Sequence, residues 1–143
     1  MDTKTITANL KCLKNFVGVF SRDTLPVVVK LPVGLVINTD KSSLPGTHWV
    51  AIYIDADGFG EYMDSFGLRP LTSDILAFLN KNCISGWEHN PITFQSPVSS
   101  ACGPYCVLFI TMRSRGCSMS EFVRMFSQKK WLNDVTALYM VDP

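Results

Sequence analysis

The sequence predicts an α+β domain in which helices flank a central, mainly antiparallel β-sheet. One indication is a β-hairpin signal: the strand-like runs Trp49–Ile54 and Gly60–Asp64 are joined by a short segment that contains Asp57-Gly58. Another is the run Cys102–Met112, which is almost entirely apolar, has a proline in its first turn and is followed closely by a glycine. A helix that is apolar on every side is expected in the core of the domain, against the sheet.

The elements before the hairpin follow from the spacing of apolar residues. Apolar positions at helical intervals predict an amphipathic helix within Ile6–Phe16. Runs of β-branched and aromatic residues then predict strands at Phe16–Phe20 and Val33–Asn38. The polar segment Thr39–Gly46 ends in Pro-Gly and is expected to be a loop.

After the hairpin, a helical pattern runs from Ile75 to Leu79, and either Thr72 or Ser73 can cap this helix. Further along, Ser118 or Ser120 can cap a helix that follows the central apolar one. Together with that central helix, the remaining predicted elements are a short strand at Ile92–Gln95 and helices at Ser118–Phe126 and Trp131–Tyr139.

Length and composition favour one domain over residues 1–143. Hydrophobic residues make up 47% of the chain and charged residues 17%, which excludes a disordered or low-complexity protein. The net charge of +1 gives no sign of a nucleic-acid footprint.

No apolar run approaches the ~20 residues of a membrane span, and no signal peptide is visible at the N-terminus. We therefore expect an intracellular monomer, in the cytoplasm or nucleus, with no membrane partner.

The cysteine count favours a reducing compartment. An odd number of cysteines in a chain of this length indicates free thiols rather than a disulfide framework. The five cysteines are Cys12, Cys83, Cys102, Cys106 and Cys117.

One pair of titratable residues is brought together by the predicted hairpin. His48 stands at the start of the first hairpin strand and Asp64 at the end of the second, so both are expected at one end of the sheet. A histidine at a strand edge is usually only a hydrogen-bonded surface residue. Beside a carboxylate, however, its tautomer is fixed and its protonated form is stabilised, as in a catalytic triad.

Cys102 is the candidate nucleophile. It follows the small-residue segment Ser99–Ala101 and begins the apolar helix, where the unpaired backbone amides and the helix dipole favour a thiolate. Cys106, four residues later, lies inside the apolar run and is expected to be a core thiol. The amide of Gln95, seven residues before Cys102, is a candidate donor for an oxyanion hole, together with the Cys102 backbone N–H.

In combination, these motifs resemble the adenovirus-type and SUMO-specific cysteine proteases, whose active site is papain-like but permuted in chain order. The matching stretches are His48-Trp49, Asp64 within Asp-Ser-Phe-Gly, Gln95 and Cys102-Gly103. The seven-residue step from Gln95 to Cys102 is more similar to the adenovirus protease than to the SUMO proteases. The resemblance extends over roughly residues 15–130 and also includes proteases of virus-related DNA transposons.

The resemblance implies a permuted papain-like fold with the nucleophile at the N-terminus of a buried helix. It further implies a thiol peptidase that cleaves protein precursors, including sites that contain glycine, by Cys-His-Asp catalysis with a glutamine in the oxyanion hole. No cofactor is implied. Protein or peptide substrates are the expected partners, and the resemblance to viral proteases adds the virion to the expected locations.

One site residue departs from the adenoviral pattern, and the activators of the adenoviral enzyme are a separate question. Asp64 stands where that enzyme usually has glutamate, which keeps the charge but shortens the side chain. DNA and a disulfide-linked peptide activate the adenoviral enzyme, and Cys83 lies near the position of its linking thiol, but here Cys83 is expected to be an ordinary core or surface thiol. Nucleic acid is a partner by resemblance alone.

Two other functions remain open at this point. One is an inactive or deconjugating relative that binds ubiquitin-like or capsid proteins. The other is a metal site built from Cys102, Cys106 and Cys117 with a histidine, although the spacing of Cys102 and Cys106 is uncommon for zinc.

Overall fold

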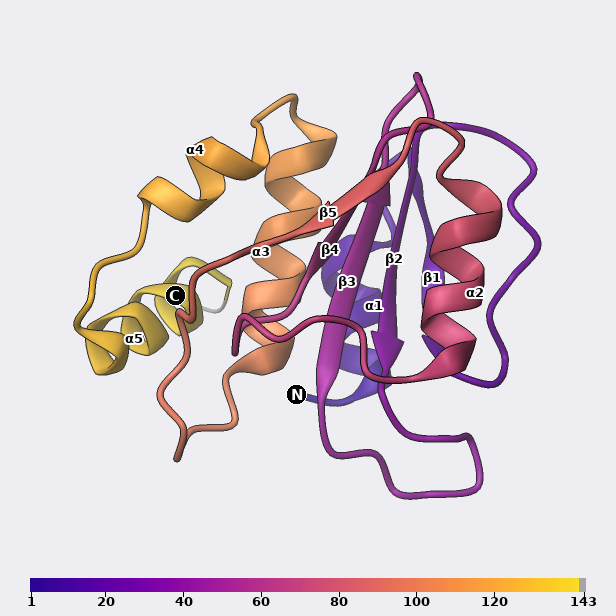
Figure 1. The fold of residues 1–143 in the computed structure, drawn as a ribbon. Coiled ribbons are helices and arrows are strands. Elements are labelled where there is room, and N and C mark those ends of the chain that lie inside the picture. Colours follow the sequence, from indigo (N-terminus) through magenta and orange to yellow (C-terminus); the bar gives the residue numbers. More distant parts are fainter. Residues whose placement is uncertain (142–143) are drawn as a thin grey trace.

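A computed structural model of the chain describes residues 1–141 and shows one five-stranded mixed sheet (Figure 1). Its strands lie in chain order: β1 (Phe16–Ser21), β2 (Val33–Asn38), β3 (Trp49–Ile54), β4 (Gly60–Met63) and β5 (Trp87–His89). The two central pairs are antiparallel, and the two outer pairs, β1–β2 and β4–β5, are parallel. The expected mainly antiparallel sheet is therefore mixed, because a crossover segment separates the strands of each outer pair and returns the chain in the same direction.

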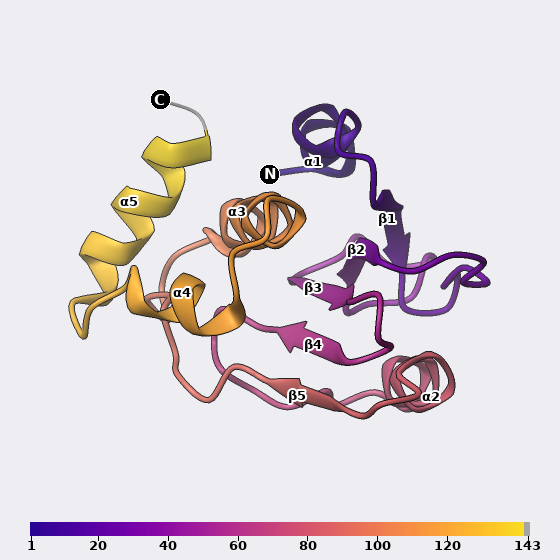
Figure 2. The same ribbon diagram turned by 90° about the horizontal axis from the view of Figure 1, so that it is seen from above.

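Helices cover both faces of the sheet, as the α+β prediction requires (Figure 2). Helices α1, α3, α4 and α5 share one hydrophobic core with the sheet, and α2 packs on the opposite face in a second core. Successive residues of β3 alternate between these cores, since Ala51 and Tyr53 belong to the first and Val50 and Ile52 to the second. The helices are α1 (Thr3–Leu10), α2 (Ser73–Asn82), α3 (Cys102–Ser114), α4 (Met119–Arg124) and α5 (Lys130–Val141).

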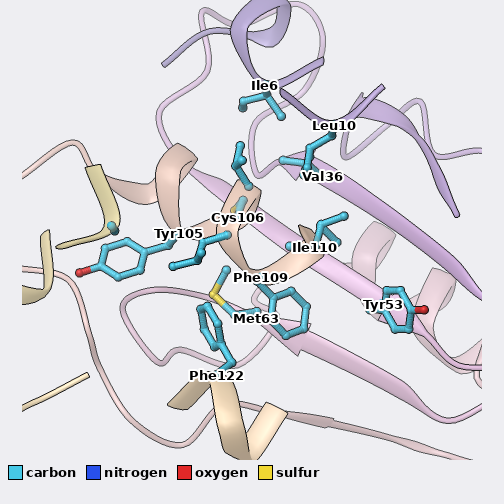
Figure 3. Close-up of a cluster of buried hydrophobic side chains, with 14 of the residues drawn as sticks. Ile6, Leu10, Val36, Tyr53, Met63, Tyr105, Cys106, Phe109, Ile110 and Phe122 are labelled. Carbon is cyan, nitrogen blue, oxygen red and sulfur yellow. The ribbon is translucent and has the colours of Figure 1, made fainter. Parts of the chain in front are cut away.

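Helix α3 is the central helix that its composition predicts. Every residue from Cys102 to Ile110 is buried, and Figure 3 shows Cys106 surrounded by side chains from other elements, including Ile6 and Val36. Cys106 has no exposed surface, and burial raises the pKa of its thiol well above the ordinary value. The prediction that Cys106 is a core residue is confirmed.

Two predicted elements differ from the structure. The first helix does not extend to Phe16: it starts early because the Asp2 carboxylate caps it by accepting the Thr5 amide at 2.8 Å, and it ends at Leu10 in a series of turns. The segment Ile92–Gln95 is not a strand. The backbone amides of Phe94 and Gln95 both donate to the Ser65 carbonyl, which is the geometry of a loop and not of a strand ladder.

One of the two predicted helix caps forms the expected hydrogen bonds and the other does not. Ser118 caps α4 through a reciprocal pair of hydrogen bonds with Glu121, as expected of a capping box. Thr72 is the residue before α2, but its hydroxyl makes no capping hydrogen bond. None of the helices within residues 1–141 has the length and apolar character needed to cross a bilayer.

Candidate active site

The β3–β4 hairpin brings His48 and Asp64 together. Ala51 pairs with Met63 in the antiparallel register, so the residue before β3 and the residue after β4 lie at the same end of the sheet. His48 Nε2 lies 2.9 Å from Asp64 Oδ1. This is the juxtaposition that the hairpin predicts, and it leaves Nδ1 as the ring nitrogen for a second partner.

Two further residues, Phe66 and Asn90, hold Asp64 and His48 in place. The Phe66 amide donates to Asp64 Oδ1 at 2.8 Å, and the Phe66 ring stacks on the imidazole with 5.0 Å between ring centres. Asn90 is fully buried and clamps the Asp64 backbone, because its Oδ1 accepts the Asp64 amide at 2.8 Å and its Nδ2 donates to the Asp64 carbonyl at 2.7 Å. Ser65, which lies between Asp64 and Phe66, contacts Gln95.

The imidazole is strongly biased toward its charged form. Burial of His48 disfavours the imidazolium, but hydrogen bonds to Asp64 and Cys102, together with the charges of these two groups, outweigh burial and raise the pKa of His48 to about 9. The ring is therefore protonated at neutral pH.

Cys102 shows the opposite shift. It is the first residue of α3, and only 7% of its surface is exposed. Burial raises the pKa of this thiol, but the hydrogen bond with His48, the backbone amides of Trp49 and Gly103 and the imidazolium charge hold the pKa below its ordinary value. The two shifts together favour a thiolate–imidazolium ion pair.

Gln95 is joined to the same end of the sheet through Ser65, the residue after Asp64. The Ser65 hydroxyl donates to Gln95 Oε1 at 2.5 Å, and Gln95 Nε2 donates to the Ser99 carbonyl at 2.9 Å. Because the side chain is 1% exposed, its amide has a fixed orientation. An amide nitrogen carries two hydrogens, so one Gln95 N–H is left for another acceptor.

A cleft of about 410 Å³ opens beside Cys102. The Trp49 indole N–H, on its rim, donates to the Met1 carbonyl at 3.0 Å, which holds the N-terminal residue against this edge of the site. Ser100, Thr47 and Gly46 also line the cleft.

The second histidine of the chain, His89, and the thiols of Cys83 and Cys117 do not join the site. His89 lies on β5, Cys83 is buried in the second core, and Cys117 follows the far end of α3 from Cys102. The thiols of the hypothetical metal site are therefore not gathered, and within residues 1–141 no group of three His, Cys, Asp or Glu side chains is suited to hold a metal ion. All five cysteines are free thiols.

Comparison of sequences finds relatives among viral proteases. A cysteine protease and a protein described as a SUMO-1 cysteine protease, both from African swine fever virus, are each 31% identical to the chain, over 101 and 110 residues. The matches cover 63% and 67% of this chain but 37% and 40% of the relatives, so the chain spans about two fifths of their length. No family model matches the sequence.

Comparison with solved structures also finds a viral protease. The crystal structure of the African swine fever virus protease matches with a TM-score of 0.55 and 25% identity, covering 73% of this chain and 42% of the viral one. The SUMO protease Ulp1 matches with a TM-score of 0.52 and 17% identity, covering 96% of this chain and 78% of the other, which bears on the fold alone.

The shifted pKa of Cys102 predicts selective alkylation. Substoichiometric iodoacetamide near pH 6 should label Cys102 before the other thiols, because the thiolate is the reactive form, and peptide mass spectrometry reads the label directly. Cys12 is the matched control, since it is an exposed free thiol. The preference should weaken in His48→Ala. Equal labelling of Cys12 and Cys102, or selectivity that survives in the variant, would contradict an activated pair.

Proposed function

Because this chain belongs to the superfamily of adenovirus-type and SUMO-protease-like cysteine proteases, we propose that it is a thiol peptidase that cleaves peptide bonds in protein precursors. The observation that carries the proposal is the convergence of His48, Asp64 and Cys102 at one end of the sheet. Asp64 orients the imidazole, and the charged imidazole lowers the pKa of the thiol. This is the arrangement that nucleophilic catalysis by cysteine needs.

In the proposed reaction, the Cys102 thiolate attacks the carbonyl carbon of the scissile peptide bond and forms a tetrahedral oxyanion. The His48 imidazolium then gives its proton to the leaving amine as the C–N bond breaks, which leaves a thioester on Cys102 and a neutral imidazole. Water, deprotonated by His48, attacks the thioester and releases the acid. The proton returned to His48 restores the ion pair as the thiolate leaves.

The oxyanion is assigned to two N–H groups. The backbone amide of Cys102 lies at the N-terminus of α3, and the second Gln95 N–H completes the pair. Because Gln95 is buried and already oriented by Ser65 and Ser99, it needs no reorganisation as charge develops. Loss of one such donor typically costs about 10²–10³ in kcat.

Access to Cys102 favours small residues at the scissile bond. The thiol is almost buried, and Met1 and Trp49 line the cleft beside it. Substrates with glycine near the cleaved bond therefore fit best. Deconjugation of a ubiquitin-like protein is the second candidate, favoured by the description of one relative as a SUMO-1 cysteine protease.

A relative that only binds such proteins would share the fold but not the chemistry. The lowered pKa of Cys102 and the raised pKa of His48 are features that binding alone does not require. We further propose that residues 1–143 form a single domain and act as a monomer.

Turnover of amidated Leu-X-Gly-Gly and Leu-X-Gly-X peptides, beside ubiquitin-family probes, tests the proposal. Cys102→Ala and His48→Ala should each lower kcat/KM by several orders of magnitude, because the nucleophile and its base act as a unit. Asp64→Asn should be milder, since an amide still holds the ring but does not stabilise its charge. Cys106→Ala is the matched control and should keep its turnover while losing up to ~2 kcal/mol of stability. Full turnover in Cys102→Ala would exclude this nucleophile.

The pH profile gives an independent test. Activity requires protonated His48, so kcat/KM should fall as the pH rises through the His48 pKa of about 9. Since Asp64 raises that pKa, Asp64→Asn should move the alkaline limb to lower pH, toward the ordinary histidine value of ~6.5. An alkaline limb at the same pH in both proteins would contradict the role given to Asp64.

A further inference from the structure

Helix α5 forms hydrogen bonds with the loop that carries Gln95, both before and after that residue. Gln95 lies between β5 and α3, in a segment without helix or strand, so regular structure does not fix its position. An amide that serves an oxyanion must nevertheless be held within a fraction of an ångström, and it needs supporting contacts. Ser65 supplies some of these contacts, and Asn133 and Asp134, adjacent residues of α5, supply others.

Asn133 holds the residue before Gln95. Its Nδ2 donates to the Phe94 carbonyl at 3.2 Å and to the Ser127 carbonyl at 2.8 Å, while its Oδ1 accepts the Ser127 amide at 2.9 Å. The Asn133 side chain is therefore fixed by the turn that precedes α5. Its hydrogen bond to the Phe94 carbonyl fixes the loop in turn.

Asp134 holds the residue after Gln95. The Ser96 amide donates to its carboxylate, with distances of 3.3 Å to Oδ2 and 3.4 Å to Oδ1. The Tyr105 hydroxyl of α3 donates to Oδ1 at 2.8 Å and lies 3.4 Å from the Phe94 carbonyl. The carboxylate thus connects the loop to the helix that begins with Cys102.

The burial of these two groups is costly. Asn133 is 3% exposed and Asp134 is 7% exposed. Within residues 1–141 no cationic side chain forms a salt bridge with Asp134, so only an amide and a hydroxyl compensate the loss of its hydration. An apolar residue would join α5 to the core without this cost. Packing alone therefore does not account for a carboxylate at this position.

We propose that Asp134 and Asn133 are positioning residues that fix the backbone on both sides of Gln95 and thereby aim its amide at the oxyanion. The proposal rests on the proposed function, in which Gln95 stabilises the tetrahedral intermediate. Neither residue touches the substrate. They act through Phe94 and Ser96, the two neighbours of Gln95.

A positioning role predicts a loss of peptide cleavage without a loss of Cys102 alkylation, which a general structural role does not predict. Acyl transfer creates an oxyanion, whereas alkylation of Cys102 by iodoacetamide creates none. Displacement of Gln95 should therefore lower kcat for peptide cleavage, leave KM nearly unchanged and leave the alkylation rate of Cys102 unchanged.

The experiment compares Asp134→Ala and Asp134→Asn in the full chain. Asp134→Ala should lower kcat about tenfold to a hundredfold, the range expected for a misplaced catalytic group. Asp134→Asn retains one acceptor oxygen and should restore a large part of the rate. Asp74→Ala is the matched control, because it removes a carboxylate from an ion pair with Arg22 on the other face of the sheet. It should keep the wild-type kcat. An unchanged Cys102 alkylation rate shows that each variant has kept a folded site. If Asp134→Ala does not fold, Asn133→Ala carries the test, because it removes the hydrogen bond to the Phe94 carbonyl on the other side of Gln95 and should lower kcat in the same way.

A double-mutant cycle with Gln95→Ala completes the test. In the Gln95→Ala background, the Asp134 substitutions should change kcat less than twofold, because there is no amide left to position. Equal losses in both backgrounds, or a wild-type kcat in Asp134→Ala, would overturn the proposal. If Gln95→Ala itself keeps full activity, then the oxyanion role of Gln95 in the proposed function has failed, which is a separate outcome.

Discussion

The hydrogen bond between His48 Nε2 and Asp64 Oδ1 is the interaction on which the candidate site depends. It forms because the antiparallel register of β3 and β4 places the two residues at one end of the sheet. Asn90 fixes the Asp64 backbone and the Phe66 ring packs on the imidazole, so neither partner is free to turn away. With Nε2 occupied, Nδ1 is left to the thiol at the start of α3. One end of the sheet and the first residue of the central helix are thus joined by this charged pair, beside the apolar core that they share.

Two cysteines on one helix illustrate how strongly position determines chemistry. Cys102 and Cys106 are one turn apart on α3, yet the pKa of the first is lowered and that of the second is raised. Burial raises the pKa of both thiols, and only at Cys102 do other groups outweigh it. Cys102 has the helix N-terminal amides and His48 beside it, whereas Cys106 has apolar side chains around it (Figure 3). The same helix therefore supplies both a reactive thiol and a core residue.

The parts of the site that depend on local pattern could be predicted from the sequence. The Asp-Gly hairpin indicates that His48 and Asp64 meet, and the switch from small residues to an apolar run indicates a helix N-terminus at Cys102. The parts that depend on distant contacts could not. Gln95 was expected at the end of a strand, but two amides that converge on the Ser65 carbonyl form a loop. Nothing near Asn90, Asn133 or Asp134 in the sequence indicates that their buried side chains hold backbone 26 to 39 residues away.

In the proposed mechanism, Cys102 forms a thioester during peptide cleavage. Mass spectrometry of the protein, quenched with acid during turnover of an activated ester of a Gly-Gly peptide, tests this claim most directly. We expect a mass increase equal to that of the acyl portion of the substrate, mapped to the peptide that contains Cys102 and absent in Cys102→Ala. An acyl group on another residue, or cleavage that continues in Cys102→Ala, would contradict it.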